Sequence, residues 1–428
     1  MIALGVFMLG GQGRVFYANT DWQVRDAVLG DMAAHKWPFA YQLGSFKVIL
    51  RAPLGMYLLP ALAGKAHELA LLLSNSVRLA LLLSLGWQLF DSNAKRLLAV
   101  SAFLLFSGWD IIGTALMSGL GRHVSWDHLE PWSLGFQYSS NITLAFWAPN
   151  HALAGWTCAL TFELWRRGKV PLGLFAAAVP LVAIWSPLAL MGAMPFVMIA
   201  GMTGLLRRAI TWRDITLACL ALLVALPSLW FMTIDAAAVG SRLRSPGGPV
   251  YLAILAFEVL PFVLPPLFAK SANQTPDPVQ RVTLWVVLVC LLFMPFGQIG
   301  IGSDFQMRSS IMPLALLALA YIGWIARLVE QTPLPRATLA CAILTLAIGA
   351  VTPAFEIHRA LTNLPAPEPQ CSLIGVWSHQ TDLVAPPATY LARASQLPGA
   401  LQNMPITAGN HDPAHCWNRV WITPRPAF

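Results

Sequence analysis

Charged residues are scarce in this sequence. Only 11% of its 428 residues are Asp, Glu, Lys or Arg, whereas 57% are hydrophobic and the mean hydropathy is +0.62. Soluble domains carry about 25% charged residues, so this shortage argues against a water-soluble globular protein. The composition predicts a chain that lies mostly in a membrane.

Several familiar signatures are also missing. The six cysteines show neither a CxxC motif nor the Cys/His spacing of a zinc site, and no internal repeat stands out. No signal-peptide cleavage site follows the apolar residues 2–9. The net charge of +8 comes from short Lys/Arg clusters between apolar runs, without a basic tail or stripe. We therefore expect no nucleic-acid partner.

Apolar runs long enough to cross a membrane, which takes about 20 residues, recur along the chain. They lie at 66–90, 97–118, 143–163, 171–185, 188–206, 214–234, 250–269, 282–300, 311–329 and 337–355. Residues 2–9 resemble the end of another, so the sequence predicts an all-α bundle of about 10 to 11 spanning helices. Within it, 171–206 is expected to form a hairpin that turns near Ser186 and Pro187.

Basic residues fall on one side of the membrane if every run crosses it. They lie in the connections 91–96, 165–169, 205–213, 270–281 and 326–336. Cytoplasmic loops are enriched in Lys and Arg. The sequence therefore predicts a multi-pass protein with a cytoplasmic N-terminus and an extracytoplasmic C-terminus.

The opposite side then receives most of the unusual polar residues. We expect a transmembrane domain over 1–355, with external loops at 10–65 and 119–142, and a small extracytoplasmic C-terminal cap over 356–428. Cys371 and Cys416 lie in this cap on the oxidising side. A disulfide between them is predicted, closing a loop of about 45 residues.

The stretch "NTDWQVRD" in the first external loop admits two interpretations. Thr20 and Gln23 match a capping box at a helix start, and Asp21 and Arg25 are spaced to pair on one helix face. Alternatively, Asp21 or Asp26 is a general base or a cation ligand at the membrane surface.

The stretch "SWDHLEPWSLGFQYSSNITLAFWAPNHALAGW" (125–156) concentrates Trp with polar residues. Pro149 is expected to break a helix there and free backbone groups that need a polar cavity or neighbouring side chains. An interfacial aromatic belt accounts for some of the Trp residues but not for the polar ones. The candidate binding residues in this stretch are His128, Glu130, Gln137, Asn150 and His151.

Charges inside or next to apolar runs supply further candidates. Arg78 and Asp110 lie within predicted helices, where a charge faces a cavity or a partner; they either serve a site or pair with each other. Asp304 and Arg308 lie in an external turn at a spacing that allows an ion pair. A guanidinium there can also hold a phosphate through two hydrogen bonds.

An acidic motif in the first long external loop resembles that of the GT-C superfamily of membrane glycosyltransferases. Longer stretches, "DWQVRDAVLGDM", "HLEPWSLGFQYSSNITLAFWAPNHALAGW" and "GSDFQMRSSIMPL", look like parts of uncharacterised bacterial multi-pass membrane proteins. The GT-C resemblance implies a polyprenyl-phosphate-linked sugar donor and a catalytic Asp or Glu in this loop. Many members carry two acids separated by one residue, whereas Asp21 and Asp26 are five positions apart.

These observations together predict a glycosyltransferase-like protein of the bacterial inner membrane that transfers a sugar to an extracytoplasmic glycan or lipid acceptor. Asp21 is the expected base, Asp26 the second acid, Arg308 the phosphate clamp and His151 an orienting group. Arg25, Asp110 and Asp304 are further expected substrate-binding residues, and the acids admit a divalent cation. Two alternatives stay open: a transporter or flippase for a lipid-linked or anionic solute, and a non-catalytic subunit that assembles the cell envelope.

Overall fold

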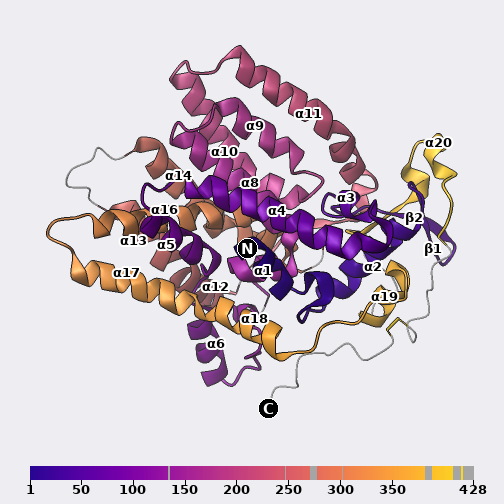
Figure 1. The fold of residues 1–428 in the computed structure, drawn as a ribbon, viewed down its shortest axis with the longest axis horizontal. Helices are drawn as coiled ribbons and strands as arrows, with labels where there is room; N and C mark the ends of the chain where they lie inside the picture. The colour runs from indigo at the N-terminus through magenta and orange to yellow at the C-terminus, as the bar shows by residue number, and fades with distance from the viewer. Residues whose placement is uncertain are drawn as a thin grey trace.

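The computed structural model is mostly helical (Figure 1). It describes residues 1–133, 135–245, 247–269, 277–300, 302–380, 388–407 and 416–417. In this part of the chain, seven helices are long and apolar enough to cross a membrane. They are Gly64–Trp87, Pro187–Leu206, Trp212–Thr233, Gly248–Phe268, Pro278–Phe296, Ile311–Val329 and Arg336–Thr362. The structure agrees in this with the multi-pass helical membrane protein that the composition predicts.

The bundle consists of these long helices and of shorter ones packed among them. Its helices are α1 (Ile2–Leu9), α4 (His67–Trp87), α5 (Asn93–Leu104), α6 (Asp110–Gly119), α7 (Asn141–Trp147), α8 (Pro149–Arg166), α9 (Leu172–Leu181), α10 (Pro187–Leu206), α11 (Trp212–Thr233), α12 (Gly248–Ile254), α13 (Leu260–Phe268), α14 (Pro278–Phe293), α16 (Ile311–Val329), α17 (Arg336–Gly349) and α18 (Val351–Thr362). A π-helical turn, Leu255–Val259, joins α12 to α13.

Three predicted spans are not continuous long helices, so the expected number of spanning helices was too high. Run 97–118 divides into α5 and α6, because the backbone between them pairs with other elements: the Trp109 amide donates to the Phe257 carbonyl at 3.1 Å. Run 143–163 divides into α7 and α8 just before Pro149. Run 171–185 forms only the ten residues of α9 and then turns at Ser186, as predicted, into α10.

Helix α16 lies at the centre of the bundle. Nearly all of its side chains are buried, and it packs against α8, α10, α13 and α14. The opposite holds for α11, whose leucines are largely exposed, such as Leu220 at 55% and Leu223 at 60%. An apolar side chain exposed over a long helix has lipid as its natural surroundings. The burial pattern therefore separates a packed interior from an outer face suited to hydrocarbon.

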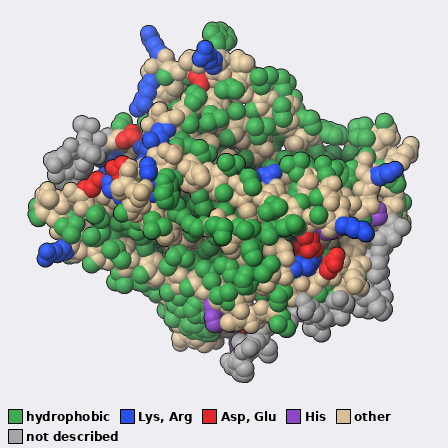
Figure 2. All heavy atoms as spheres, in the orientation of Figure 1, with side chains coloured by type: hydrophobic (Ala, Val, Ile, Leu, Met, Phe, Trp, Pro, Cys, Tyr) green, Lys and Arg blue, Asp and Glu red, His purple; other side chains and the backbone are tan. Residues whose placement is uncertain are grey.

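Basic side chains gather at one end of the bundle, at the left and upper-left edge of the surface in Figure 2. Arg166 ends α8, and Arg207 follows α10 directly. Both helices begin at the other end. There Asn150 of α8 donates to the Trp185 carbonyl, and His151 of α8 lies beside Ser186, which precedes α10. The 18 residues of α8 span about 27 Å, close to the roughly 30 Å of a hydrocarbon core.

The end opposite the basic residues carries a small layer of mixed structure, at the right of Figure 1. A three-stranded antiparallel sheet in the order β1-β2-β5 joins residues 41–50 to the C-terminal segment. The elements of this end are α2 (Asp21–Ala34), β1 (Tyr41–Leu43), β2 (Phe46–Leu50), α3 (Leu58–Ala61), β3 (Ser241–Leu243), β4 (Gly297–Ile299), α15 (Asp304–Ser309), α19 (Leu373–Gln380), β5 (Leu391–Arg393) and α20 (Gly399–Gln402). The all-α prediction missed these short strands, and α18 runs across the boundary predicted at 355.

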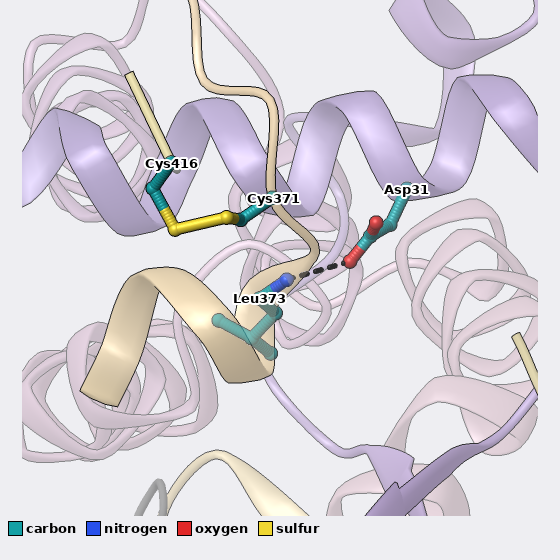
Figure 3. The surroundings of a disulfide bond; sticks show 4 residues. All are labelled: Asp31, Cys371, Leu373 and Cys416. Atoms are coloured by element: carbon teal, nitrogen blue, oxygen red, sulfur yellow. Dashed lines mark hydrogen bonds between the residues drawn. A yellow bond between two sulfur atoms is a disulfide. The ribbon is translucent and has the colours of Figure 1, made fainter. Parts of the chain in front are cut away.

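The C-terminal segment is closed on itself by a disulfide and tied to α2 by one carboxylate (Figure 3). The predicted disulfide is confirmed: Cys371 and Cys416 are bonded, with their Cα atoms 4.8 Å apart. Asp31 of α2 accepts hydrogen bonds at Oδ2 from the Tyr41 hydroxyl at 2.8 Å and from the Leu373 amide at 2.9 Å. Burial raises the pKa of Asp31 to about 6, although both hydrogen bonds oppose the shift.

Orientation in the membrane can be tested by cysteine labelling. Helices α17 and α18 run from Arg336 at one end of the bundle, and Glu356 lies 20 residues after Arg336 along them. His128 of the loop 119–142 bonds to Glu356, so this loop lies at the end opposite Arg336. In a background without the four free cysteines, we predict that Ser125→Cys reacts with an impermeant maleimide in intact cells. Arg208→Cys should react only after permeabilisation; the reverse pattern would contradict the orientation.

A second prediction concerns Asp31. In the folded protein its pKa lies above the ordinary value. Burial of the carboxyl therefore costs no folding free energy below about pH 4, where the group is protonated in both states, and up to about 3 kcal/mol above about pH 6, where it is ionised in both. Asp31→Asn keeps an acceptor oxygen, and we predict that its melting temperature rises relative to wild type through this interval. Asp235→Asn should behave oppositely, because Arg393 lowers the pKa of Asp235. A difference from wild type that is constant with pH would contradict the prediction for Asp31.

Candidate functional site

Helix α2 is docked on the break between α7 and α8. The Phe146 carbonyl would pair with the Asn150 amide in an unbroken helix. It accepts instead from Asn19 Nδ2 at 2.9 Å and from Trp22 Nε1 at 2.7 Å. The predicted break at Pro149 is thus confirmed, and its freed carbonyl fixes the first turn of α2 over the start of α8.

The start of α8 is tied in turn to the turn between α9 and α10. Asn150 Nδ2 donates to the Trp185 carbonyl at 3.2 Å, and His151 Nδ1 lies 2.7 Å from Ser186 Oγ. Both side chains are nearly fully buried. The helix break therefore presents an amide and an imidazole at a fixed position beside α2.

Helix α15 is the third element of the site, after α2 and the start of α8. Gly192 of α10 lets the two backbones approach so closely that a Cβ there would lie 2.0 Å from the Ser309 carbonyl oxygen. On α15, the predicted ion pair is confirmed: Arg308 Nη2 lies 2.9 Å from Asp304 Oδ1. A glycine in α10 thus allows an Asp–Arg pair to come near the start of α8.

These three parts enclose a cavity of about 260 Å³. It is lined by polar, charged and aromatic side chains from segments far apart in the sequence. The lining residues are Asp21, Val24, Arg25, Val28, Ala52, Pro53, Tyr57, Asn150, His151, Asp304, Arg308, Trp377, Thr389 and Tyr390. The cavity lies at the end of the bundle opposite the basic residues, because Asn150 and His151 stand in the first turn of α8.

Two acids and two arginines face this cavity. Arg25 lies 3.7 Å from Asp21 and donates to Asn150 Oδ1 at 3.2 Å, while its buried Nε has no partner among the described residues. Burial raises the pKa of Asp304 despite the opposing charge of Arg308, and the charge of Asp21 raises it further. The Asp21 side chain is 44% exposed, against 23% for Asp304. Asp21 is thus the more accessible acid.

The capping interpretation of this segment is only partly right. Thr20 has helical backbone angles and forms no side-chain cap, so the predicted capping box is wrong. Asn19 instead satisfies a backbone amide at the start of α2: its Oδ1 accepts from the Asp21 amide at 3.1 Å. The predicted pair of Asp21 with Arg25 is present but long at 3.7 Å. It leaves the carboxylate accessible at the cavity.

Asp26 lies outside the cavity. Its carboxylate pairs with Arg14 at 3.1 Å, and Arg14 also holds Glu68 at 2.5 Å. Burial raises the pKa of Asp26 to about 7, an effect that Arg14 reduces. The two acids expected to act together are therefore separated, and Asp304 is the second acid that faces the cavity.

Four of the expected substrate-binding residues form a separate buried cluster. Glu130 Oε1 accepts from the Ser140 amide at 2.8 Å, and Gln137 donates to the other oxygen of Glu130. Asp110 Oδ2 accepts from the hydroxyls of Ser107 and Thr352 at 2.8 and 2.9 Å. Burial raises the pKa of Glu130 to about 7, and the nearby charge of Asp110 adds to the shift.

His128 closes this cluster toward the surface. Its Nδ1 lies 2.8 Å from Glu356 Oε1, and its ring stacks on Trp147 with centroids 4.7 Å apart. Trp147 and Arg359 both donate to the other oxygen of Glu356. Among the described residues, none of Asp110, His128, Glu130 and Gln137 lines the cavity of Asp21.

Three further arginines, Arg78, Arg242 and Arg244, have structural partners. The alternative pairing of Arg78 with Asp110 does not occur: Arg78 lies over the Trp185 ring, 4.3 Å from its centroid. Arg242 donates to Gln298 at 2.9 Å, and Arg244 lies 4.1 Å over the ring of Phe136. The cavity arginines are thus Arg25 and Arg308.

The aromatic residues that line the cavity were not predicted from the sequence. Tyr57 follows the first small sheet, whereas Trp377 and Tyr390 come from the C-terminal segment. The predicted disulfide concerned this segment but did not place it over the cavity. Nothing local to these three residues indicated that they would face Asp21.

The site offers no ready set of metal ligands. Within the described ranges, no group of three or more His, Cys, Asp or Glu side chains is arranged to hold a metal ion. The divalent cation expected from the acids therefore stays a prediction without a ligand set.

Comparison with known proteins leaves the site to be interpreted from its own geometry. No protein-family model, no curated protein and no solved structure matches this chain.

Proposed function

We propose that this protein is a membrane glycosyltransferase that moves a sugar from a polyprenyl-phosphate donor to an acceptor at the extracytoplasmic surface. One observation carries the proposal. An accessible carboxylate, two arginines, a histidine and three aromatic rings converge on one cavity at the end of the bundle opposite the basic loops. Each is a group that such a transfer requires.

The arginines suit the phosphate of the donor. A guanidinium binds a phosphate through two parallel hydrogen bonds and stays charged when buried. Arg25 lines the cavity, and its 3.7 Å contact with Asp21 is long enough to leave the guanidinium available to a ligand. Arg308 is held in position by Asp304 at 2.9 Å. Together they would stabilise the negative charge that develops on the leaving phosphate.

Asp21 is the proposed base. A general base must come within hydrogen-bond reach of the acceptor hydroxyl, and Asp21 is the more exposed of the two acids at the cavity. Its contact with Arg25 is too long to occupy the carboxylate fully. Asp304, tied to Arg308, is assigned to positioning that arginine.

The aromatic residues suit the sugar. Trp377, Tyr57 and Tyr390 present rings with polar tips, which can contact a sugar face and also form hydrogen bonds. A cavity of about 260 Å³ lies just below the range of roughly 300 to 1,000 Å³ that holds drug-sized ligands. It therefore favours a single sugar unit over an oligosaccharide.

A transporter is the second candidate. The observation in its favour is the buried cluster around Asp110 and Glu130, since acids inside a bundle often mark ion or substrate pathways. Transporter sites, however, lie near the middle of the membrane. The cavity of Asp21 lies at one end of α8, which favours the transferase.

The base is tested by two asparagine substitutions five residues apart on α2. We predict that Asp21→Asn lowers sugar transfer from a radiolabelled polyprenyl-phosphate hexose about 10²- to 10⁴-fold, the usual contribution of a general base. Asp26→Asn, matched in chemistry but facing Arg14, should change transfer less than tenfold. Equal losses in both variants, at equal protein abundance, would remove Asp21 from the base's role.

The clamp is tested by binding. We predict that Arg308→Gln weakens binding of a polyprenyl phosphate at least tenfold, whereas Arg308→Lys recovers only part of it because an ammonium cannot bind bidentately. Arg242→Gln, at the same end but bonded to Gln298, is the control and should bind as wild type. Unchanged affinity in Arg308→Gln would show that the phosphate lies elsewhere.

A further inference from the structure

A second and larger cavity lies at the basic end of the bundle. Its volume is about 550 Å³, and it is formed where α8 and α10 end and α9 and α11 begin. Thr203 and Gly204 line it from α10, and Thr211 from the start of α11. Three arginines and one acid also line it: Arg166, Arg207, Arg213 and Asp214.

The acids near this cavity are already engaged. Arg166 is neutralised by Glu163, with Nη2 and Oε1 2.6 Å apart, and also pairs with Asp277. Asp214 Oδ1 accepts from the Gly173 amide at 2.6 Å, and its Oδ2 accepts from the Thr211 amide and hydroxyl at 2.9 and 2.7 Å. This carboxylate therefore caps α9 and α11 and has little capacity left for an arginine.

The positive charges of Arg207 and Arg213 are not neutralised by any residue that the structure describes. Neither side chain makes an ion pair or a hydrogen bond with any residue that the structure describes. Both residues are exposed and line the same cavity. Two free guanidiniums facing one hollow form a site for an anion that carries more than one acceptor oxygen, such as a phosphate.

The surroundings of this cavity indicate that the anion belongs to a lipid. Leu206 is 80% exposed and Trp212 is 83% exposed, on either side of the loop that carries Arg207. Trp at such a position is typical of a membrane interface. Helices α10 and α11 continue from there as exposed apolar surface, along which acyl chains can lie.

We propose that this cavity binds the phosphate headgroup of an anionic phospholipid from the leaflet at the basic end of the bundle. Basic pockets between membrane helices on the cytoplasmic side bind anionic headgroups, and the basic loops predict that this end is cytoplasmic. The site is separate from the cavity of Asp21, because Asn150 and Arg166 stand at opposite ends of α8. A bound lipid would hold the basic end of the bundle at one leaflet, while the cavity of Asp21 faces the opposite membrane surface.

Native mass spectrometry of the full chain in detergent tests the proposal, with phosphatidylglycerol and phosphatidylcholine as probes. We expect wild type to prefer phosphatidylglycerol. Since each surface arginine contributes about fivefold to the binding of an anionic lipid, the Arg207→Gln/Arg213→Gln variant should lose roughly 30-fold in affinity, and Arg213→Gln alone about fivefold. Arg208→Gln is the matched control: the residue is exposed in the same loop but does not line the cavity.

Three results would overturn the proposal. Equal binding of the two lipids by wild type would remove the headgroup preference. A loss in Arg208→Gln as large as in the double variant would show only diffuse attraction to a basic surface. Displacement of phosphatidylglycerol by millimolar inorganic phosphate would assign the site to a soluble anion. An unchanged lipid-free melting temperature of the double variant confirms that any loss is not due to unfolding.

Discussion

The whole candidate site depends on one backbone carbonyl. A helix broken inside a membrane bundle leaves polar groups that water cannot satisfy, so side chains must do so. At the break before Pro149, the Phe146 carbonyl receives both Asn19 and Trp22. These two hydrogen bonds hold the first turn of α2 at the break; Asp21 lies between Asn19 and Trp22 in sequence, and Arg25 follows three residues after Trp22. The energetic cost of the broken helix is thus offset by contacts that position the acid and the arginine.

Close packing then brings the other groups to the same point. The missing Cβ of Gly192 lets α15 approach α10, and Arg308 reaches the cavity from there. Asp31 ties the C-terminal segment to α2 on the other side, the disulfide closes that segment on itself, and Trp377 and Tyr390 face the cavity from it. The length of α8 separates this site from the basic end by about one hydrocarbon thickness. A lipid-borne substrate would meet it at the membrane surface.

Features governed by composition or by local chemistry could be predicted from the sequence. The apolar runs, the break at Pro149, the turn at Ser186, the pair of Asp304 with Arg308 and the disulfide all rest on single residues or short spacings. The number of long helices could not be predicted, because the division of 97–118 depends on a hydrogen bond from Trp109 to Phe257, a residue distant in sequence. The composition of the site was predicted only in part for the same reason. Asp21, Arg25, His151 and Arg308 do share one cavity, whereas Asp110 and Glu130 are drawn into another cluster by partners that no local pattern reveals.

The central claim is that the cavity of Arg25 and Arg308 receives the phosphate of a polyprenyl lipid. The most direct measurement is a cryo-EM map of the full chain in nanodiscs, saturated with a polyprenyl phosphate. The account predicts phosphate density within hydrogen-bond distance of both guanidiniums, with the prenyl chain leaving the cavity toward the bilayer. Phosphate density at the basic end alone, or beside Asp110 and Glu130 while the cavity of Asp21 stays empty, would contradict it.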